Sequence, residues 1–318
     1  MFDHILVPMD GSSLAECVLP HAMAIARVCE SQVTLLRVLE RTQARDATQS
    51  IDPLDWHIRR AEAEAHLNEL STRLQKAGLR TENALLEGQA AERIIEFSHS
   101  HAVSLVILSS HGRSGLSGWN VSSIVQKVIL RVRTPLMIVR AYQPIASDLA
   151  DLRYRRLLVP LDCSQRAECA LPLATTLARF HEAELLLLHV VSKPEMVQRA
   201  PLTHKDTALA DQLTERNRLA ATRYLENLGA RLSPNIQSRV LISDNAAAAL
   251  HDMVEQEKAD LVVLSAHGYS GRTKWPYGSM AVNFIAYGTT PLLIVQDLPP
   301  GKMEYTRAEI AAREHKGH

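Results

Sequence analysis

Two copies of one short stretch carry the residues best suited to bind a phosphate. The first copy runs from Val106 to Ser123 and the second from Val262 to Ser279, and each passes from an apolar run through Ser-x-His-Gly into a loop of small residues. Small residues let a backbone approach a ligand closely, and the unpaired N–H groups that open a helix favour an anion. A plain connecting turn also needs Gly and Ser, so loop composition alone leaves both interpretations open.

The duplication favours a binding loop over a plain turn. Matching residues recur at one constant spacing through both copies, which is more detail than a spacer needs. The matched pairs are His111 and His267, Gly112 and Gly268, Ser114 and Ser270, Gly115 and Gly271, Trp119 and Trp275, and Ser123 and Ser279. For the two tryptophans we favour packing of the loop onto the following helix over stacking on a base.

The same stretches offer little for catalysis. His111 and His267 could act as general bases, but spacing places no nucleophile or carboxylate beside either, so we interpret both as structural loop residues. The chain has no Walker GxxxxGK[ST] loop and no acidic pair spaced to hold Mg²⁺. We therefore predict no catalytic residue and no metal ligands from the protein.

The loops belong to a longer repeat of alternating strands and helices. Each half opens with an apolar strand that ends in an aspartate, Asp10 or Asp162, and each closes with Thr-Pro and a last strand. The order β-α-β-α-β-α-β-α-β predicts a parallel sheet with helices on both faces. The expected strands lie at Ile5–Val7, Val33–Val38, Ala84–Glu87, the run from Val106 and Thr134–Val139, and at Leu157–Asp162, Leu185–Val190, Arg239–Ile242, the run from Val262 and Thr290–Val295.

Two local features of the first helix of each half give testable expectations. Ser13 and Glu16 have the spacing of a capping box. Pro20 and Pro172 stand where a helix is expected, so either that helix is kinked or its regular part begins later than the cap suggests. A further short helix is expected around Arg307–Arg313.

Length and composition limit the class of protein. The 318 residues suggest two domains, predicted at 1–142 and 153–297 with a linker across Ala141–Tyr154. The 35 basic and 35 acidic residues balance, which gives no support for a nucleic-acid partner. The sequence shows no signal peptide and no apolar run long enough for membrane insertion, and its cysteines lack metal spacing, so we expect a cytoplasmic protein with reduced thiols.

With these residues in place, both halves resemble the universal stress protein family, from about Met1 to Arg140 and from about Arg155 to Gln296. The ATP-binding members of that family carry G-x2-G-x9-G-[ST] after the fourth strand, with an Asp of the first strand and a Val of the second near the adenosine. The second half reads Ser-x2-Gly-x9-Gly-Ser, with one glycine replaced, and the first half reads Ser-x2-Gly-x9-Ser-Ser, with two replaced. A side chain at Ser122 would matter if the backbone needed a positive φ, and would be harmless if Ser122 capped the helix.

The resemblance implies an α/β fold of two tandem Rossmann-like (adenine-nucleotide α-hydrolase-like) domains, each a five-stranded parallel sheet with helices on both faces. It implies a stress-response protein that binds ATP with Mg²⁺, more through the second domain, as a regulatory or sensor module and a homodimer. The alternatives are an interaction scaffold without nucleotide and a weak ATP-hydrolysing enzyme. Asp10 and Asp162 could bond nearby backbone N–H groups in a turn, accept a hydrogen bond from the adenosine part of the nucleotide, or do both. The residues expected at the nucleotide are Asp162, Val190, Ser265, His267, Gly268, Gly278 and Ser279, and Asp10, Val38, Ser109, Gly112, Ser122 and Ser123.

Overall fold

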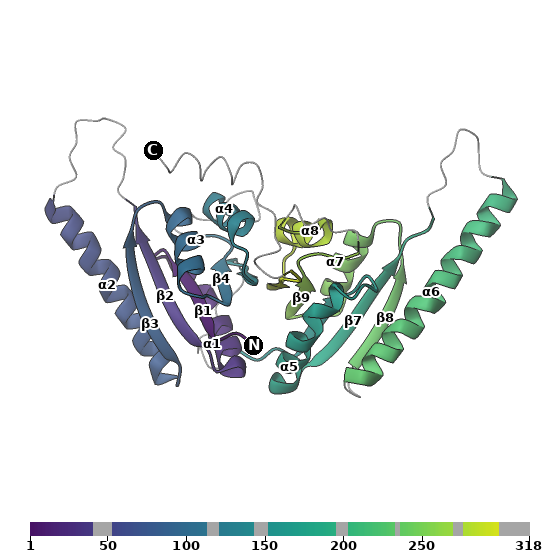
Figure 1. The fold of residues 1–318 in the computed structure, drawn as a ribbon, viewed down its shortest axis with the longest axis horizontal. Coiled ribbons are helices and arrows are strands. Elements are labelled where there is room, and N and C mark those ends of the chain that lie inside the picture. Colours follow the sequence, from purple (N-terminus) through teal and green to yellow (C-terminus); the bar gives the residue numbers. More distant parts are fainter. Residues whose placement is uncertain are drawn as a thin grey trace. The chain divides into compact units, whose positions relative to one another are not determined.

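The computed structural model describes residues 1–40, 53–112, 121–142, 152–194, 203–232, 236–269 and 276–298. These residues form two compact units (Figure 1). Among them, unit 1 comprises Met1–Arg153 with Ile285–Pro291 and Leu298, and unit 2 comprises Tyr154–Phe284 with Leu292–Asp297.

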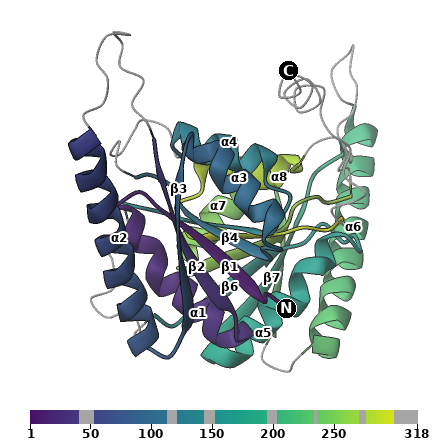
Figure 2. The same cartoon turned by 60° about the vertical axis from the view of Figure 1, so that its left-hand side comes forward.

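Unit 1 contains a parallel sheet of strand order β3-β2-β1-β4-β5. Its order runs outward from β1 in one direction through β2 and β3 and in the other through β4 and β5. Right-handed crossovers therefore place α1 and α2 on one face and α3 and α4 on the other, as Figure 2 shows. The strands are β1 His4–Met9, β2 Gln32–Leu39, β3 Arg80–Glu87, β4 Leu105–Ser109 and β5 Leu136–Val139, and the helices are η1 Ala15–Cys17, α1 Val18–Cys29, α2 Pro53–Lys76, α3 Ala90–Ser100 and α4 Ser123–Arg131.

Unit 2 repeats this topology with the order β8-β7-β6-β9-β10. The predicted five-stranded parallel sheets with helices on both faces are thus confirmed in both units. The strands are β6 Arg156–Pro160, β7 Glu184–Val191, β8 Ile236–Ile242, β9 Leu261–Ser265 and β10 Leu292–Val295, and the helices are η2 Ala167–Ala170, α5 Leu171–His181, α6 His204–Leu232, α7 Ala246–Gln256 and α8 Ser279–Tyr287.

The apolar pattern explains which strands are central. Every residue of β4 and of β9 is buried, as expected for strands covered by helices on both faces. The long α2 covers the sheet through Ala63, Leu67, Leu70 and Leu74, which recur at helical spacing on one face. The remaining surface of α2 is largely polar, so it faces solvent.

The strand order sets the position of a ligand site. In unit 1, β1 pairs with both β2 and β4, and the equivalent β6 of unit 2 pairs with β7 and β9. The chain leaves β1 and β4, and likewise β6 and β9, in opposite directions across the sheet. A crevice forms at the carboxyl ends of such strands, where open parallel sheets bind ligands.

Two expectations about helix starts are resolved. Pro20 is the third residue of α1 and Pro172 the second of α5, within the first turn, where a backbone N–H has no helical partner to lose. The later start is therefore correct. The predicted capping box of Ser13 and Glu16 is wrong. The backbone N–H of Ala15 donates to the hydroxyl of Ser12 at 3.2 Å. The Glu16 carboxylate accepts a hydrogen bond from Arg73 at 3.0 Å.

Other expectations lie outside the described residues. They are the helix around 307–313, the two loop tryptophans Trp119 and Trp275, and the linker between 143 and 151. Within the described part of the chain, no helix is both long and apolar enough to cross a bilayer.

Candidate functional site

Each unit has a cavity at the carboxyl ends of its strands. The cavity of unit 2 has a volume of about 610 Å³ and that of unit 1 about 280 Å³. Every residue predicted for the second half lines the unit 2 cavity: Asp162, Val190, Ser265, His267, Gly268, Gly278 and Ser279. Of those predicted for the first half, Asp10, Val38, Ser109, Gly112 and Ser122 line the unit 1 cavity and Ser123 does not. The structure thus brings the predicted residues together, and their contact with a nucleotide stays a prediction.

A carboxylate packs directly against the second glycine of each loop. A Cβ atom on Gly268 would lie 2.1 Å from Asp162 Oδ2, and one on Gly112 would lie 2.0 Å from Asp10 Oδ2. Real Cβ atoms do not approach an oxygen so closely, so only glycine fits at either position without moving the carboxylate. This contact explains the paired Asp and Gly of the sequence by geometry.

The two aspartates also act as turn residues, as one of the weighed interpretations held. Asp162 Oδ1 accepts hydrogen bonds from the backbone N–H and the hydroxyl of Ser164, at 3.0 and 2.6 Å, and Oδ2 accepts one from the Tyr269 N–H. Asp10 Oδ1 is bonded in the same way to Ser12. In unit 2 the carboxylate therefore ties the end of β6 to the loop that follows β9.

The serines that replace the first family glycine brace the loop from within. Ser109 and Ser265 each place their hydroxyl 2.6 Å from the carbonyl oxygen two residues ahead, that of His111 or His267. A hydroxyl has one proton to donate, and both serines are buried. The hydroxyl proton is thus used inside the protein.

Ser122 and Gly278 have equivalent backbone roles. Their N–H groups donate to the carbonyls of Ser110 and Ala266, at 2.8 and 2.7 Å. Ser122 has φ −69° and accepts a hydrogen bond from Val125 as the cap of α4, and Gly278 does not have a left-handed φ. The idea that this position needs a positive φ is therefore wrong, and Ser122 fits the loop of unit 1 without strain.

His267 has a carboxylate partner that the sequence interpretation missed. Its Nδ1 lies 2.7 Å from Asp297 Oδ1, and Arg166 Nε lies 2.7 Å from Asp297 Oδ2. Spacing along the sequence places no carboxylate beside His267, and the fold supplies one from the end of another strand. The pairing of β9 with β10 brings these two residues together. Ser265 and Val295 are partners at the ends of the two strands, so His267 and Asp297, each two residues further on, lie side by side.

Unit 1 has different chemistry at the matching positions. Leu14 stands in place of Arg166 and Ala141 in place of Asp297, and His111 Nδ1 lies 3.1 Å from the hydroxyl of Ser110. The His-Asp-Arg chain is therefore specific to unit 2.

The walls of the two cavities also differ in charge and width. In unit 1, Arg37 from β2 extends over Gly11, so that a Cβ there would lie 2.7 Å from its guanidinium, and Arg59 and Glu40 line the same cavity. In unit 2 the residue matching Arg37 is His189, whose Nδ1 lies 2.8 Å from the carbonyl of Leu161. The unit with the larger cavity thus has the shorter side chain at this position.

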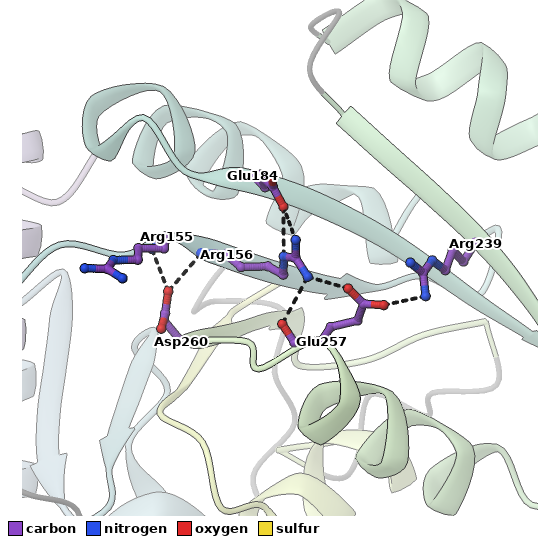
Figure 3. Close-up of polar contacts among 6 residues, drawn as sticks. All are labelled: Arg155, Arg156, Glu184, Arg239, Glu257 and Asp260. Atoms are coloured by element: carbon purple, nitrogen blue, oxygen red, sulfur yellow. Dashed lines mark hydrogen bonds and ion pairs between the residues drawn. The ribbon is translucent and has the colours of Figure 1, made fainter.

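A second polar cluster lies around the amino ends of β6, β7 and β9 (Figure 3). None of its members lines the unit 2 cavity. Arg156 binds Glu184 and Glu257, Arg239 also binds Glu257, and Asp260 accepts the N–H groups of Arg155 and Arg156 at 2.6 and 2.8 Å. These charges satisfy one another, so we interpret the cluster as structural. In the described part of the chain, no three His, Cys, Asp or Glu side chains are grouped to hold a metal ion.

A parallel sheet of this order, with a glycine loop packed on a first-strand carboxylate at its switch point, defines a Rossmann-like α/β protein with a crevice for a ligand. The chain belongs to the universal stress protein family, because the family model described as "Universal stress protein family" matches residues 1–140 and 153–296.

Individual relatives agree with this assignment. Universal stress protein MJ0577 of Methanocaldococcus jannaschii is 22% identical over 155 residues, which is 44% of this chain and 96% of that protein. Universal stress protein Mb2028c of Mycobacterium bovis is 25% identical over 200 residues, 62% of this chain and 63% of that protein.

Solved structures show the same fold along nearly the whole chain. A universal stress protein from Archaeoglobus fulgidus has a TM-score of 0.64 at 19% identity, covering 93% of this chain and 98% of its own. The functionally unknown protein PA1789 of Pseudomonas aeruginosa has a TM-score of 0.68 at 15% identity, covering 98% of both chains.

Proposed function

We propose that this stress-response family protein binds an adenine nucleotide, ATP, in the cavity of unit 2 and acts as a regulatory or sensor module of the cytoplasm. The observation that carries the proposal is the cavity of about 610 Å³ at the switch point, into which the Gly268 loop and the start of α8 open. A volume of roughly 300–1,000 Å³ is typical of small-molecule sites.

The lining residues suit the two ends of a nucleotide. Val190 and Leu264 supply apolar surface for an adenine, and Asp162 lies nearby as an acceptor. Ser279 opens α8 directly after Gly278, and the backbone N–H groups of the first helical turn and the Ser279 hydroxyl suit phosphate oxygens. The described residues group no carboxylates for a cation, so Mg²⁺ would enter with the phosphates that hold it.

Unit 2 is proposed as the stronger site because of space rather than backbone strain. The unit 1 cavity, at about 280 Å³, falls just below the usual range and is lined by the long side chains Arg37 and Arg59. The capping geometry of Ser122 shows that glycine replacement alone does not distinguish the units.

A matched pair of variants tests this assignment. Gly268→Val forces a side chain into Asp162 and should lower ATP affinity at least tenfold, whereas Gly112→Val, which makes the same clash with Asp10, should reduce it far less. Calorimetry with ATP and Mg²⁺ measures both, and circular dichroism checks that each variant is folded. A larger loss for Gly112→Val would assign the site to unit 1.

The same measurements separate the alternatives. Absence of binding by the unmutated protein, together with no small molecule released from it on denaturation, would favour the scaffold. Phosphate release at a rate above that of free ATP would favour the hydrolysing enzyme. The proposed homodimer predicts a light-scattering mass of twice the 35.3 kDa of one chain.

A further inference from the structure

Behind the unit 2 loop, a carboxylate is bonded on one side to an imidazole and on the other to a guanidinium. His267 Nδ1 lies 2.7 Å from Asp297 Oδ1, and Arg166 Nε lies 2.7 Å from Asp297 Oδ2. The side chains of His267 and Asp297 are each 1% exposed, and that of Arg166 is 29% exposed. A carboxylate removed from water to this degree is destabilising unless charged or hydrogen-bonded partners compensate it, so this pair depends on its geometry.

The contact with Asp297 determines which ring nitrogen of His267 carries a proton. Burial raises the pKa of Asp297, but the hydrogen bonds from His267 and Arg166 outweigh burial and hold that pKa below its usual value. An ionised carboxylate only accepts hydrogen bonds, so Nδ1 of His267 must carry a proton. The ring therefore has one neutral tautomer available, and its protonated form gains the attraction of Asp297.

The charge of the His267 ring can act on the ligand loop, because His267 belongs to that loop. Its carbonyl accepts the Ser265 hydroxyl at 2.6 Å, and its neighbour Gly268 packs on Asp162. The ring thus connects the end of β10 and the start of η2 to the backbone that borders the cavity. In unit 1 the neutral Ser110 hydroxyl stands beside His111 instead.

We propose that Asp297 and Arg166 are positioning residues for the nucleotide loop of unit 2: they fix the tautomer of His267, set the charge of its ring, and thereby tune the affinity of the adjacent backbone for phosphate. This proposal rests on the proposed nucleotide site. A positive ring beside the loop attracts an anion, so ATP affinity at unit 2 rises as the pH falls through the titration of His267.

A thiol and a phenol near His267 do not share this change of charge. The described titratable groups that line the cavity or adjoin Asp297 are Asp162 after β6, Arg166 before η2, Cys169 within η2, His189 of β7 and Tyr277 before α8. Burial raises the pKa of the Cys169 thiol to about 12 and also raises that of the Tyr277 hydroxyl, so both stay neutral near pH 7. Imidazole is the side chain whose ordinary pKa lies nearest pH 7. Of the two imidazoles at the cavity, that of His267 is bonded to Asp297 and that of His189 to the Leu161 carbonyl, so a change at Asp297 acts on His267.

Calorimetry on the full chain tests the effect on binding. Asp297→Asn keeps a hydrogen-bond acceptor for Nδ1 but removes the carboxylate that stabilises the protonated ring, so the ratio of unmutated to variant ATP affinity at unit 2 should be about three- to tenfold higher at pH 6 than at pH 8. The protonation of ATP itself also changes with pH, but it is the same in both experiments. The ratio of the two affinities therefore reports changes in the protein alone. Ser110→Ala, at the partner of His111, is the matched control and should leave the unit 2 profile unchanged. An affinity ratio that is the same at every pH would overturn the proposal.

Nuclear magnetic resonance of the histidine ring nitrogens tests the network without nucleotide. Unmutated protein should show the proton on Nδ1 of His267 at neutral pH. Asp297→Asn should lower the midpoint of the His267 titration, because it removes the negative charge beside the ring. Arg166→Gln should raise the midpoint, because it removes a positive charge bound to the same carboxylate. Midpoints that do not move in these opposite directions would refute the network, whereas a normal network without any ATP binding would refute the nucleotide site alone.

Discussion

At the scale of single residues, each departure from the family pattern has a specific physical role. Ser109 and Ser265 stand where the pattern has glycine, and their buried hydroxyls hold the carbonyl two residues ahead at 2.6 Å. Glycine is required instead at Gly112 and Gly268, because a carboxylate occupies the space of a Cβ. A loop can therefore exchange one glycine for a brace while another is fixed by its neighbour.

Removing the Ser265 hydroxyl should affect the stability of the protein more than its affinity for ATP. Ser265→Gly restores the family residue but removes the donor to the His267 carbonyl, so we expect a loss of about 1 kcal/mol in the free energy of unfolding and a less than threefold change in ATP affinity. Urea unfolding and calorimetry measure the two quantities, and Ser109→Gly is the control in unit 1. A large loss of affinity with unchanged stability would mean that the hydroxyl contacts the ligand.

The residues of the candidate site were predictable to the extent that they lie in local patterns. Asp162, Gly268 and Ser279 belong to short motifs whose strand and helix context can be read along the chain. Asp297 belongs to no motif and reaches His267 because β9 and β10 pair in one register. Arg166 likewise depends on where the turn after β6 directs its side chain, which spacing alone does not define.

At the scale of elements, hydrophobic runs and Gly- or Pro-containing boundaries predicted the strands and helices well. Helix starts were harder, because competing side chains decide them: Ser12 rather than Ser13 bonds the first turn of η1, and Glu16 is bound to Arg73 of α2. Tertiary contacts thus replaced the capping box that the local sequence suggested. Contacts at the amino ends of the strands also differ between the units. Arg156 binds acidic side chains in unit 2, whereas His4 stands at the matching position of unit 1 and its backbone N–H donates to the Ser104 hydroxyl.

The charge cluster of Figure 3 should contribute to stability more through Glu257 than through Glu184. Glu257 binds both Arg156 and Arg239 and is 11% exposed, whereas Glu184 is 51% exposed. Glu257→Gln should therefore lower the free energy of unfolding by about 1–3 kcal/mol, and Glu184→Gln by less than about 1 kcal/mol. Urea unfolding at low and high salt measures both variants, and equal losses would show that burial does not decide the contribution of these pairs.

At the scale of the whole molecule, two copies of one fold carry different polar interiors. Unit 2 has the spacious cavity and the His-Asp-Arg chain, while unit 1 has a narrower cavity and a histidine inside its first helix. His21 of α1 is buried, and burial lowers its pKa to about 4, whereas Leu173 occupies the matching place in α5. The duplicated sheet thus keeps its topology while the groups that respond to pH differ between the units.

This difference predicts acid sensitivity in unit 1. His21 is neutral in the folded protein down to about pH 4 but takes up a proton below about pH 6.5 when unfolded, so the unfolded state binds more protons and stability falls as the pH falls between these values. The loss should be about 2–3 kcal/mol between pH 7.5 and 4.5. His21→Leu, which installs the unit 2 residue, should remove that part of the pH dependence, and Leu173→Met should not. Urea unfolding followed by circular dichroism at both pH values measures the effect, and an unchanged pH dependence in His21→Leu would mean that His21 is charged or accessible in the folded protein.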